Sequence, residues 1–460
     1  MTAGGELFSN WCKNQQNFCS SSLIVYDQLF ALTRSILINP KLAIGSQGGE
    51  NIQDVLNRAE NAEFYQFSKG FIQVPCSNVT SFEKMPIFGS GNNLAKWASS
   101  IEVYDIQQIA STCNSTGMIS HVIDDFTIAV TRYDYANIYH TITDLYTVYI
   151  LCRFFNRDPK ETRILFVDGH PKGNLDNLWS TLFHSYKRLG QYRTSNQSMI
   201  FYQELIWSYQ QSLSHLDVAR GDVKERVYIN EFRRHVLTSF NISIIDDSSP
   251  VNCDHVSIFL LLRKNYIAHP RNPTGKVSRQ IGNEAQLLQE LKRKLNESTL
   301  FANKIKFNSG SFETLSVHDQ LNTVFNSDIV LGIHGAGLTH ALFMKQNRVM
   351  IELYSRTADH FRLLAQAHNV NYLHCVITET EVSATTVAGC ITQMFKLMCP
   401  QTVISLTTTI SSSATTTTKH LTSSTTTFVT NLTNSTTTTP LSSNTTTTIT
   451  STTVSVKVNI

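Results

Sequence analysis

Residues 329–340 read IVLGIHGAGLTH, a short apolar run that leads directly into a glycine-rich loop. The apolar run suits a buried strand, and we expect the loop after it to begin a helix. A helix start presents unpaired backbone N–H groups and a partial positive charge, both of which favour a bound phosphate. Glycine at positions 335 and 337 would let the backbone approach such a ligand closely. The stretch therefore predicts a strand, a loop and a helix that together bind an anionic group.

The side chains of this loop support the same interpretation. His334 and His340 can donate hydrogen bonds to phosphate oxygens, and a threonine lies beside His340. The candidate phosphate-binding loop consists of His334, Gly335, Ala336, Gly337, Leu338, Thr339 and His340. An ordinary tight turn would also explain a lone Gly-x-Gly. An esterase oxyanion loop is disfavoured because the chain has no Gly-x-Ser-x-Gly nucleophile elbow.

Strand and helix patterns extend from the loop through the second half of the chain. The run VSIFLLL is almost continuously apolar, as expected for a parallel strand covered on both faces. Ser316 begins a helix with a capping pattern to Asp319. The predicted strands are 256–262, 304–307, 328–333 and 349–353, and a further helix is predicted at 283–295. This half is therefore an α/β unit of the nucleotide-binding type.

The first half shows the same alternation after about residue 120. Strands are predicted at 126–131 and 163–167, and helices at 141–155 and 175–183. Residues 246–250 are polar and mark the junction between the halves. We predict an α/β protein with one domain at 121–248 and a second, nucleotide-binding domain at 249–400. Residues 1–120 have few periodic runs and are taken as the N-terminal part of the first domain.

Length and charge exclude some function classes. The 460 residues, 41% of them hydrophobic, suffice for more than one buried core. A net charge of +3 with no basic stripe disfavours a nucleic-acid partner. No run of 18 apolar residues occurs, and residues 1–10 lack the pattern of a signal peptide. Taken alone, these features would indicate a cytosolic protein.

Other features favour the secretory pathway. Nine cysteines occur without the close spacing of a zinc site, and Asn-x-Ser/Thr acceptor sites occur at Asn78, Asn114, Asn196, Asn241, Asn296, Asn431, Asn434 and Asn444. Residues 401–460 are dominated by threonine and serine, which predicts a disordered, mucin-like tail. An uninformative low-complexity tail is the alternative. We expect the lumen of the Golgi or endoplasmic reticulum, with an N-terminal membrane anchor that this sequence does not include.

Polar residues after the predicted strands are candidates for binding the donor. The chain has no Asp-x-Asp triplet, so protein donors must balance a diphosphate without an essential metal or cofactor. Arg263, His269, Arg271 and Lys276 are the candidates, and Arg263 follows a fully apolar strand. Glu352 ends the strand at 349–353, where it could bind ribose hydroxyls. A surface salt bridge of Arg263 and a plain strand-end position of Glu352 are the alternatives.

The first half supplies the candidates for a general base. Asp134 and His140 lie between a predicted strand and helix, where a cleft between facing domains would fall. We favour Asp134 as the base, followed by His140, and we keep Asp144 as a third catalytic candidate. A structural salt bridge of Asp134 with Arg132 or another basic group remains an alternative, as does a helix-start hydrogen bond of His140. Asp168 and His170 follow the next strand and are expected to shape the acceptor or donor site, together with His269 and Arg271.

Four blocks of the sequence resemble the plant-type core β-1,2-xylosyltransferases that act on N-glycans. They are residues 131–144 (TRYDYANIYHTITD), 166–170 (FVDGH), 262–277 (with LR, YIAHPR and GKV) and 333–340 (IHGAGLTH). The similarity spans about 126–399. Transferases that place N-acetylglucosamine on EGF domains or on O-mannose resemble this chain mainly in the first and fourth blocks. Asp134 stands where glutamate is commoner in the family.

This resemblance implies a GT-B fold, in which two Rossmann-like domains face each other across a cleft. It makes 121–248, with 1–120, the acceptor-side domain and 249–400 the nucleotide-sugar-binding domain. It also implies an inverting transfer of xylose from UDP-xylose to the core β-mannose O2 of an N-glycan, without an essential divalent metal. The missing Asp-x-Asp agrees independently with metal-free transfer. Two rivals stay open: a UDP-GlcNAc-dependent transferase acting on a protein or glycoprotein hydroxyl, and a catalytically inactive relative that binds glycans or nucleotides.

Overall fold

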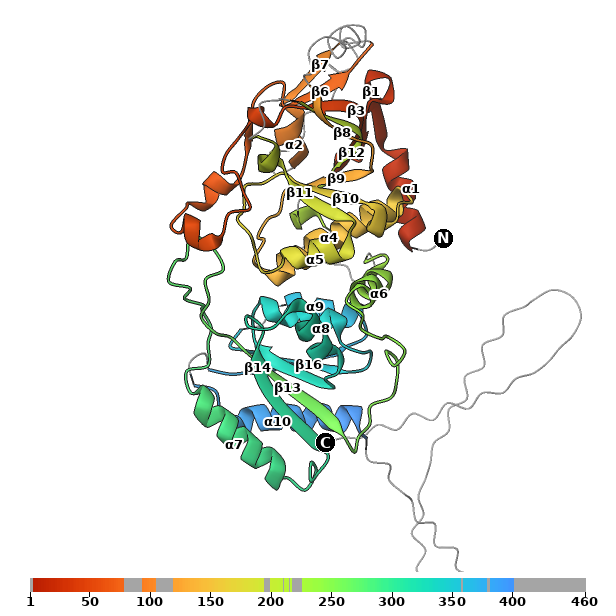
Figure 1. The fold of residues 1–460 in the computed structure, drawn as a ribbon. Helices are drawn as coiled ribbons and strands as arrows, with labels where there is room; N and C mark the ends of the chain where they lie inside the picture. The colour runs from red at the N-terminus through yellow and green to blue at the C-terminus, as the bar shows by residue number, and fades with distance from the viewer. Residues whose placement is uncertain are drawn as a thin grey trace, which may run out of the picture. The chain divides into compact units, whose positions relative to one another are not determined.

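The structure is a computed structural model in which two large sheets and their covering helices can be followed (Figure 1). It describes residues 3–77, 93–104, 119–193, 199–209, 211–214, 216, 226–356, 359–378 and 381–400. The predicted tail at 401–460 lies outside the described residues, as do the acceptor sites at Asn78, Asn114, Asn196, Asn431, Asn434 and Asn444. Residues 1–402 form one compact unit.

The first sheet is mixed and has the strand order β1-β2-β3-β12-β9-β10-β11. Strands β8, β12, β9, β10 and β11 pair in parallel, while β1, β2, β3 and β12 pair antiparallel along the other side. Its strands are β1 (Gln15–Phe18), β2 (Leu23–Tyr26), β3 (Phe30–Ile38), β6 (Ile72–Pro75), β7 (Ile101–Tyr104), β8 (Ile119–Ile123), β9 (Thr127–Val130), β10 (Arg163–Phe166), β11 (Ser185–Arg188) and β12 (Met199–Trp207). The predictions at 126–131 and 163–167 are confirmed as β9 and β10. The N-terminal strands show that residues before 120 build half of this sheet.

The helices of this part are α1 (Ala3–Lys13), α2 (Asn93–Ala98), α4 (Ile138–Phe154), α5 (Asp176–Leu182) and α6 (Ile229–Ser239). Helix α4 is apolar around most of its circumference and is buried along nearly its whole length, as expected for a core helix. It begins three residues before the predicted start because the Asn137 side chain accepts a hydrogen bond from the backbone N–H of Tyr139 at 3.0 Å. This cap fixes the chain between β9 and α4, where the candidate bases lie.

The second sheet is entirely parallel and has the order β14-β13-β15-β16-β17. Its strands are β13 (Val256–Leu262), β14 (Ile305–Ser311), β15 (Ile329–Ile333), β16 (Val349–Tyr354) and β17 (Asn371–Val376). Relative to the chain this is the order 2-1-3-4-5 of a doubly wound sheet. The strand order therefore reverses between β13 and β15, while the strands stay parallel. Ligands of such sheets bind beyond the carboxyl ends of the strands at this switch point.

Helices cover both faces of this sheet. They are α7 (Glu284–Glu297), α8 (Val317–Phe325), α9 (His360–Ala367) and α10 (Ala384–Met398). Figure 1 shows α7 and α10 along one face and α8 and α9 along the other. Alternate side chains of β13 pack into the hydrophobic cores on the two faces of the sheet. Leu260 lies in the core on the α7 and α10 side, and Phe259 lies in the core on the α8 side. This explains why β13 reads as a continuous apolar run.

The glycine loop begins a helix, as predicted. Residues Ala336–Phe343 form it as a 3-10 helix, η11. The backbone N–H of Leu338 donates to the carbonyl oxygen of Gly335 at 2.9 Å, three residues earlier, as the tighter winding requires. The predicted cap of the preceding helix is confirmed, because the backbone N–H of Asp319 donates to the Ser316 hydroxyl at 3.1 Å.

Six of the nine cysteines form disulfides: Cys19–Cys76, Cys253–Cys399 and Cys375–Cys390. Cys253 precedes β13 and Cys399 follows α10, so one bridge ties together the two ends of the second α/β unit. Cys12 and Cys152 are free thiols, and Cys113 lies outside the described residues.

Candidate active site

Arg263 and Gly335 meet at the switch point of the second sheet. Arg263 directly follows β13, and Gly335 lies two residues after the neighbouring strand β15. A Cβ atom added at Gly335 would lie 1.5 Å from Nη1 of Arg263. The backbone of Gly335 is extended, so a larger residue here would be opposed by the Arg263 side chain and not by the dihedral angles. The guanidinium therefore lies directly against the glycine loop, as the sequence predicts for a shared phosphate site.

The positive charge of Arg263 is not neutralised within the described part of the chain. Its Nε donates to the carbonyl oxygen of Ser278 at 3.2 Å, and no carboxylate pairs with it there. Burial, followed by the nearby charge of Arg279, lowers the pKa of Arg263 from its ordinary value. A half-buried guanidinium beside a second arginine and an open backbone loop can hold an anion such as a diphosphate.

His340 and Thr339 lie beneath the loop and are both buried. Burial lowers the pKa of His340 to about 4, so its ring is neutral near pH 7. Because Nδ1 carries the proton donated to Gly337, Nε2 of the neutral ring is an acceptor. Direct donation from His340 to a phosphate, as expected from the sequence, does not fit this tautomer. The packing favours a role in supporting the loop.

Glu352 lies behind the loop. It is fully buried, one carboxylate oxygen contacts Nδ1 of His334, and the other accepts a hydrogen bond from the Tyr372 hydroxyl at 2.6 Å. The ring of His334 also stacks on Tyr354 with centroids 4.2 Å apart. Both carboxylate oxygens thus have protein partners. This arrangement favours positioning of His334 by Glu352 over direct contact with ribose hydroxyls.

The remaining loop residues differ in how deeply they are buried. A Cβ atom at Gly337 would lie 2.8 Å from Cδ2 of Leu261, so this glycine permits close packing on β13. Leu338 is buried in the core, whereas Ala336 is half-buried. Of the two glycines, the structure therefore connects only Gly335 with the predicted anion site.

The carboxyl ends of β9, β10 and β11 hold a buried network of charges. Arg132 follows β9 and binds Asp168, which follows β10, as well as Asp176 at 3.0 Å. Arg188 at the end of β11 binds Asp176 at 2.5 Å. Burial would raise the pKa of Asp168, but the charge and hydrogen bonds of Arg132 together with His170 lower it to about 2. Asp168 is therefore ionised and has a structural role, because it holds Arg132 in place next to the candidate site.

His170 extends this network toward the N-terminal part of the chain. Its Nδ1 contacts Oε2 of Glu63 at 2.7 Å, and its Nε2 contacts the carbonyl oxygen of Arg132 at 3.1 Å. Arg58 binds Glu63 and also Glu50. The segment 45–63, with the 3-10 helices η3 (Ile52–Val55) and η4 (Glu60–Glu63), therefore packs against the strand ends. Sequence reasoning missed this segment, although the adjacent glycines at 48 and 49 marked a turn with positive φ.

Asp134, the favoured base, lies within hydrogen-bonding distance of His269. The distance from Oδ1 of Asp134 to Nε2 of His269 is 3.1 Å, and both side chains are about 15% exposed, at 15% and 14%. The partner of Asp134 is therefore not Arg132. Burial would raise the pKa of Asp134, but His269, followed by His140 and the amide of Ala136, lowers it overall.

The other two catalytic candidates lie one helical turn apart on α4. His140 is half-buried, and its ring meets that of Tyr133 with centroids 4.8 Å apart. Asp144 is buried and accepts a hydrogen bond from the backbone N–H of Tyr133. Burial raises the pKa of Asp144 well above its ordinary value. The loop 131–137 thus brings all three candidates into one neighbourhood.

Arg271 and Lys276, two further basic candidates, lie in the loop after β13. Arg271 forms an ion pair with Glu60 at 2.8 Å, and Lys276 is exposed. The structure gives Arg271 a role in joining the loop to segment 45–63. The prediction that Lys276 binds the donor stays a prediction.

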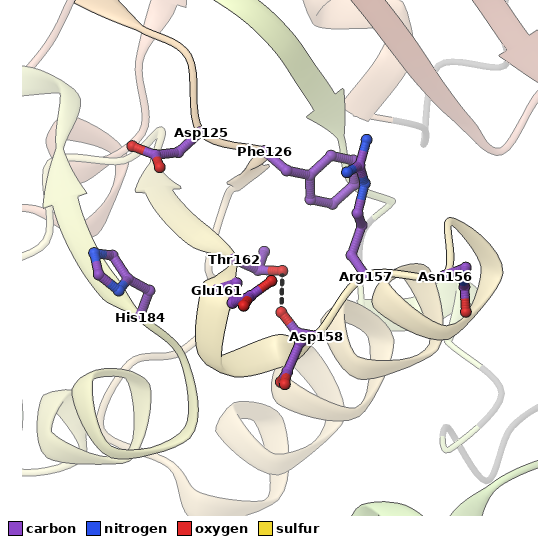
Figure 2. Close-up of a pocket in the computed structure, with 8 residues that line it drawn as sticks. All are labelled: Asp125, Phe126, Asn156, Arg157, Asp158, Glu161, Thr162 and His184. Atoms are coloured by element: carbon purple, nitrogen blue, oxygen red, sulfur yellow. Dashed lines mark hydrogen bonds between the residues drawn. The ribbon is translucent and has the colours of Figure 1, made fainter.

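A hollow of about 410 Å³ lies at the amino-terminal ends of β9, β10 and β11 in the first sheet (Figure 2). Phe126, Thr162 and His184 line it from positions just before β9, β10 and β11. The candidate residues Asp134 and Asp168 follow the other ends of these strands, so the hollow is separate from the candidate site. Within the described ranges, no three histidine, cysteine, aspartate or glutamate side chains gather as metal ligands would, and no helix is long and apolar enough to cross a membrane.

Comparisons with known proteins connect this site with carbohydrate chemistry. The model of the family described as Glycosyltransferase 61 matches residues 119–351, which run from β8 into β16. The β-1,2-xylosyltransferase RCN11 of Oryza sativa subsp. japonica is 26% identical over 361 residues, covering 73% of this chain and 66% of the relative. The β-1,2-xylosyltransferase of Arabidopsis thaliana is 24% identical over 413 residues, covering 79% and 76%. The EGF domain-specific O-linked N-acetylglucosamine transferase of Gallus gallus is 36% identical over 96 residues, covering 21% and 17%.

Proposed function

This chain belongs to glycosyltransferase family 61, and we propose that it transfers xylose from UDP-xylose to the core β-mannose of N-glycans, forming a β-1,2 linkage. The similarity to the two β-1,2-xylosyltransferases extends over about three quarters of this chain. The similarity to the N-acetylglucosamine transferase of Gallus gallus has a higher identity but covers only 21% of the chain. The extent of the first similarity favours xylose as the transferred sugar.

The observation that carries the proposal is the contact between Arg263 and the backbone of Gly335. It puts an unneutralised cation at the switch point of a doubly wound sheet, the position where such sheets bind nucleotides. A UDP leaving group bound there would have its developing charge balanced by Arg263. Transfer would then proceed without an essential metal or another cofactor.

The acceptor would bind to the first half of the chain. Asp134 and His140 come from the loop and helix that follow β9, whereas Arg263 comes from the second sheet. In a GT-B arrangement the two sheets would belong to facing domains, with the donor on one and the glycan on the other. Inversion needs a single displacement in which a base removes the acceptor proton as UDP departs.

A secretory compartment fits this activity. Disulfides form and persist in oxidising compartments, and this chain has three among its described residues. The acceptor sites Asn241 and Asn296 are both exposed, as glycosylation requires. We therefore propose the lumen of the Golgi or endoplasmic reticulum as the place of action.

The proposal is tested by incubating the protein with a trimmed N-glycan and either UDP-xylose or UDP-GlcNAc. We expect mass analysis to show addition of one pentose from UDP-xylose and no product from UDP-GlcNAc. Addition of N-acetylglucosamine instead would assign the chain to the other activity found in the family. UDP binding without any transfer would indicate an inactive relative. Arg263→Ala should abolish transfer while leaving the thermal midpoint near that of the parent.

A further inference from the structure

The structure assigns the proton-accepting step to His269, with Asp134 as the residue that positions its ring. This inference rests on the proposed transferase function and names the base within it. His269 lies in the loop that follows β13, 135 positions after Asp134 in the chain, and the two side chains meet at 3.1 Å. The sequence pattern had given the base to Asp134 itself and a donor- or acceptor-shaping role to His269.

The state of Asp134 argues against its acting as the base. Its Oδ1 contacts Nε2 of His269 and also accepts a hydrogen bond from the backbone N–H of Ala136 at 3.2 Å. The net effect of these partners is a lowered pKa. A carboxylate that is both hydrogen-bonded and held ionised is a weak proton acceptor, but it is well suited to stabilise a neighbouring imidazolium.

The two nitrogens of His269 have different environments. If Nε2 donates its proton to Asp134, Nδ1 of the neutral ring is an acceptor. Nδ1 is buried and has no hydrogen-bond partner among the described residues. A buried polar atom without a partner is unfavourable, so such atoms call for a reason, and catalysis is one of them. A substrate hydroxyl that donates to Nδ1 would satisfy it.

The surroundings hold the His269 ring in place. The ring of Tyr135 meets it edge to face with centroids 5.2 Å apart. The next carbonyl oxygen, that of Pro270, accepts a hydrogen bond from the backbone N–H of Asn57 at 2.8 Å. The loop closes on itself where the backbone N–H of Tyr266 donates to the carbonyl oxygen of Gly275 at 3.0 Å. A base fixed in this way needs little reorganisation during the reaction.

The same loop also begins with Arg263, so one segment carries both the proposed base and the cation of the leaving-group site. Arg263 and His269 are six positions apart along this loop. In the reaction, the acceptor O–H proton moves to Nδ1 of His269 and the oxygen forms a bond to the anomeric carbon. The bond from that carbon to the diphosphate breaks, and its electron pair leaves on the UDP oxygen beside Arg263.

The test uses the full chain with UDP-xylose and a trimmed N-glycan, and compares His269→Gln, His269→Ala and Asp134→Asn. We expect kcat to fall by about 100-fold or more in both His269 variants, with unchanged affinity for UDP in calorimetry. Added imidazole should restore part of the activity of His269→Ala. It should not help Asp134→Asn, which keeps its histidine. His318→Gln is the matched control, because His318 contacts Asp319 at 3.1 Å on an exposed helix face and should tolerate the change.

Each contrary result has a distinct meaning. If the parent transfers xylose and His269→Ala keeps its kcat, or if imidazole restores nothing, His269 is not the base while the proposed function stands. If the loss lies in UDP affinity, His269 binds the diphosphate and the assignment is overturned. UDP binding shows that each variant is folded. A parent that transfers no sugar from any UDP-sugar would overturn the proposed function, and the assignment with it.

Discussion

Arg132 binds Asp168 through two parallel contacts, with Nη2 at 2.7 Å from Oδ1 and Nε at 3.1 Å from Oδ2. Both residues are buried, and each follows one of two adjacent parallel strands. The pair therefore ties the carboxyl ends of β9 and β10 together directly beneath the loop of Asp134. Its geometry supports the candidate site without contacting a substrate.

Replacing Asp168 by asparagine should destabilise the protein strongly. The substitution keeps the size of the side chain but leaves the buried charge of Arg132 with only Asp176 as an ionic partner. We expect the free energy of unfolding in urea to fall by about 3 kcal/mol. Glu297→Gln is the control, because the Arg293–Glu297 pair is exposed and should contribute less than about 0.5 kcal/mol. Equal effects of the two substitutions would show that the Asp168 pair is not important for stability.

Gly335→Ala should impair donor binding through Arg263. The new methyl group would overlap Nη1 of Arg263 and force the guanidinium away from the loop. We expect UDP affinity to fall by roughly 10-fold, corresponding to about 1.4 kcal/mol. Adding Gly335→Ala to Arg263→Ala should cause little further loss, because both changes remove the same interaction.

The control for this prediction is Gly389→Ala on α10, where an added Cβ meets no atom within 4 Å. Alanine is the better helix former, so this variant should be as stable as the parent or more so, with unchanged UDP affinity. Additive losses in the Gly335 and Arg263 double variant would show that the two positions act independently.

The Arg263–Gly335 site could be predicted from sequence because it depends on short-range patterns. Apolar runs identified β13 and β15, and neighbouring parallel strands bring their carboxyl ends to the same edge. The pairing of Asp134 with His269 could not be predicted, since it depends on the path of an irregular loop. The sequence pattern assigned both residues to the site but did not predict that their side chains contact each other.

The N-terminal part was missed for a different physical reason. Strands β1, β2, β6 and β7 have only four residues each, and the contact of Glu63 with His170 joins residues 107 positions apart. Strand β11, later in the chain, was missed as well, because SYKR lacks the apolar pattern of a buried strand. Local periodicity carries no information on such contacts, which become visible only when the whole first sheet is assembled.

Buried neutral His340 should make stability depend on pH. Its pKa is about 4 in the folded protein and near 6.5 in the unfolded chain, so the unfolded chain binds more protons between these values. Stability is therefore full above about pH 6.5 and falls by up to about 3 kcal/mol as the pH drops to 4. His340→Gln should weaken the pH dependence of the thermal midpoint. Part of this dependence should remain, because buried His368 also has a pKa near 4. The exposed variant His318→Gln should leave the slope unchanged, and an unaltered slope in His340→Gln would contradict the prediction.

Glu352→Gln should weaken donor binding by loosening His334, not by removing a contact to ribose. Both oxygens of Glu352 are engaged, one by His334 and one by Tyr372, and the carboxylate is completely buried. We expect a roughly 10-fold loss of affinity for UDP, or about 1.4 kcal/mol, and a smaller loss for Tyr372→Phe, which removes one of the two hydrogen bonds. Calorimetry with UDP and 2′-deoxy-UDP separates the two roles. If Glu352 is a positioning residue, Glu352→Gln lowers the affinity for both nucleotides by the same factor. If Glu352 binds the 2′-hydroxyl, the variant loses affinity only for UDP, and Glu352 would then be assigned to ribose binding.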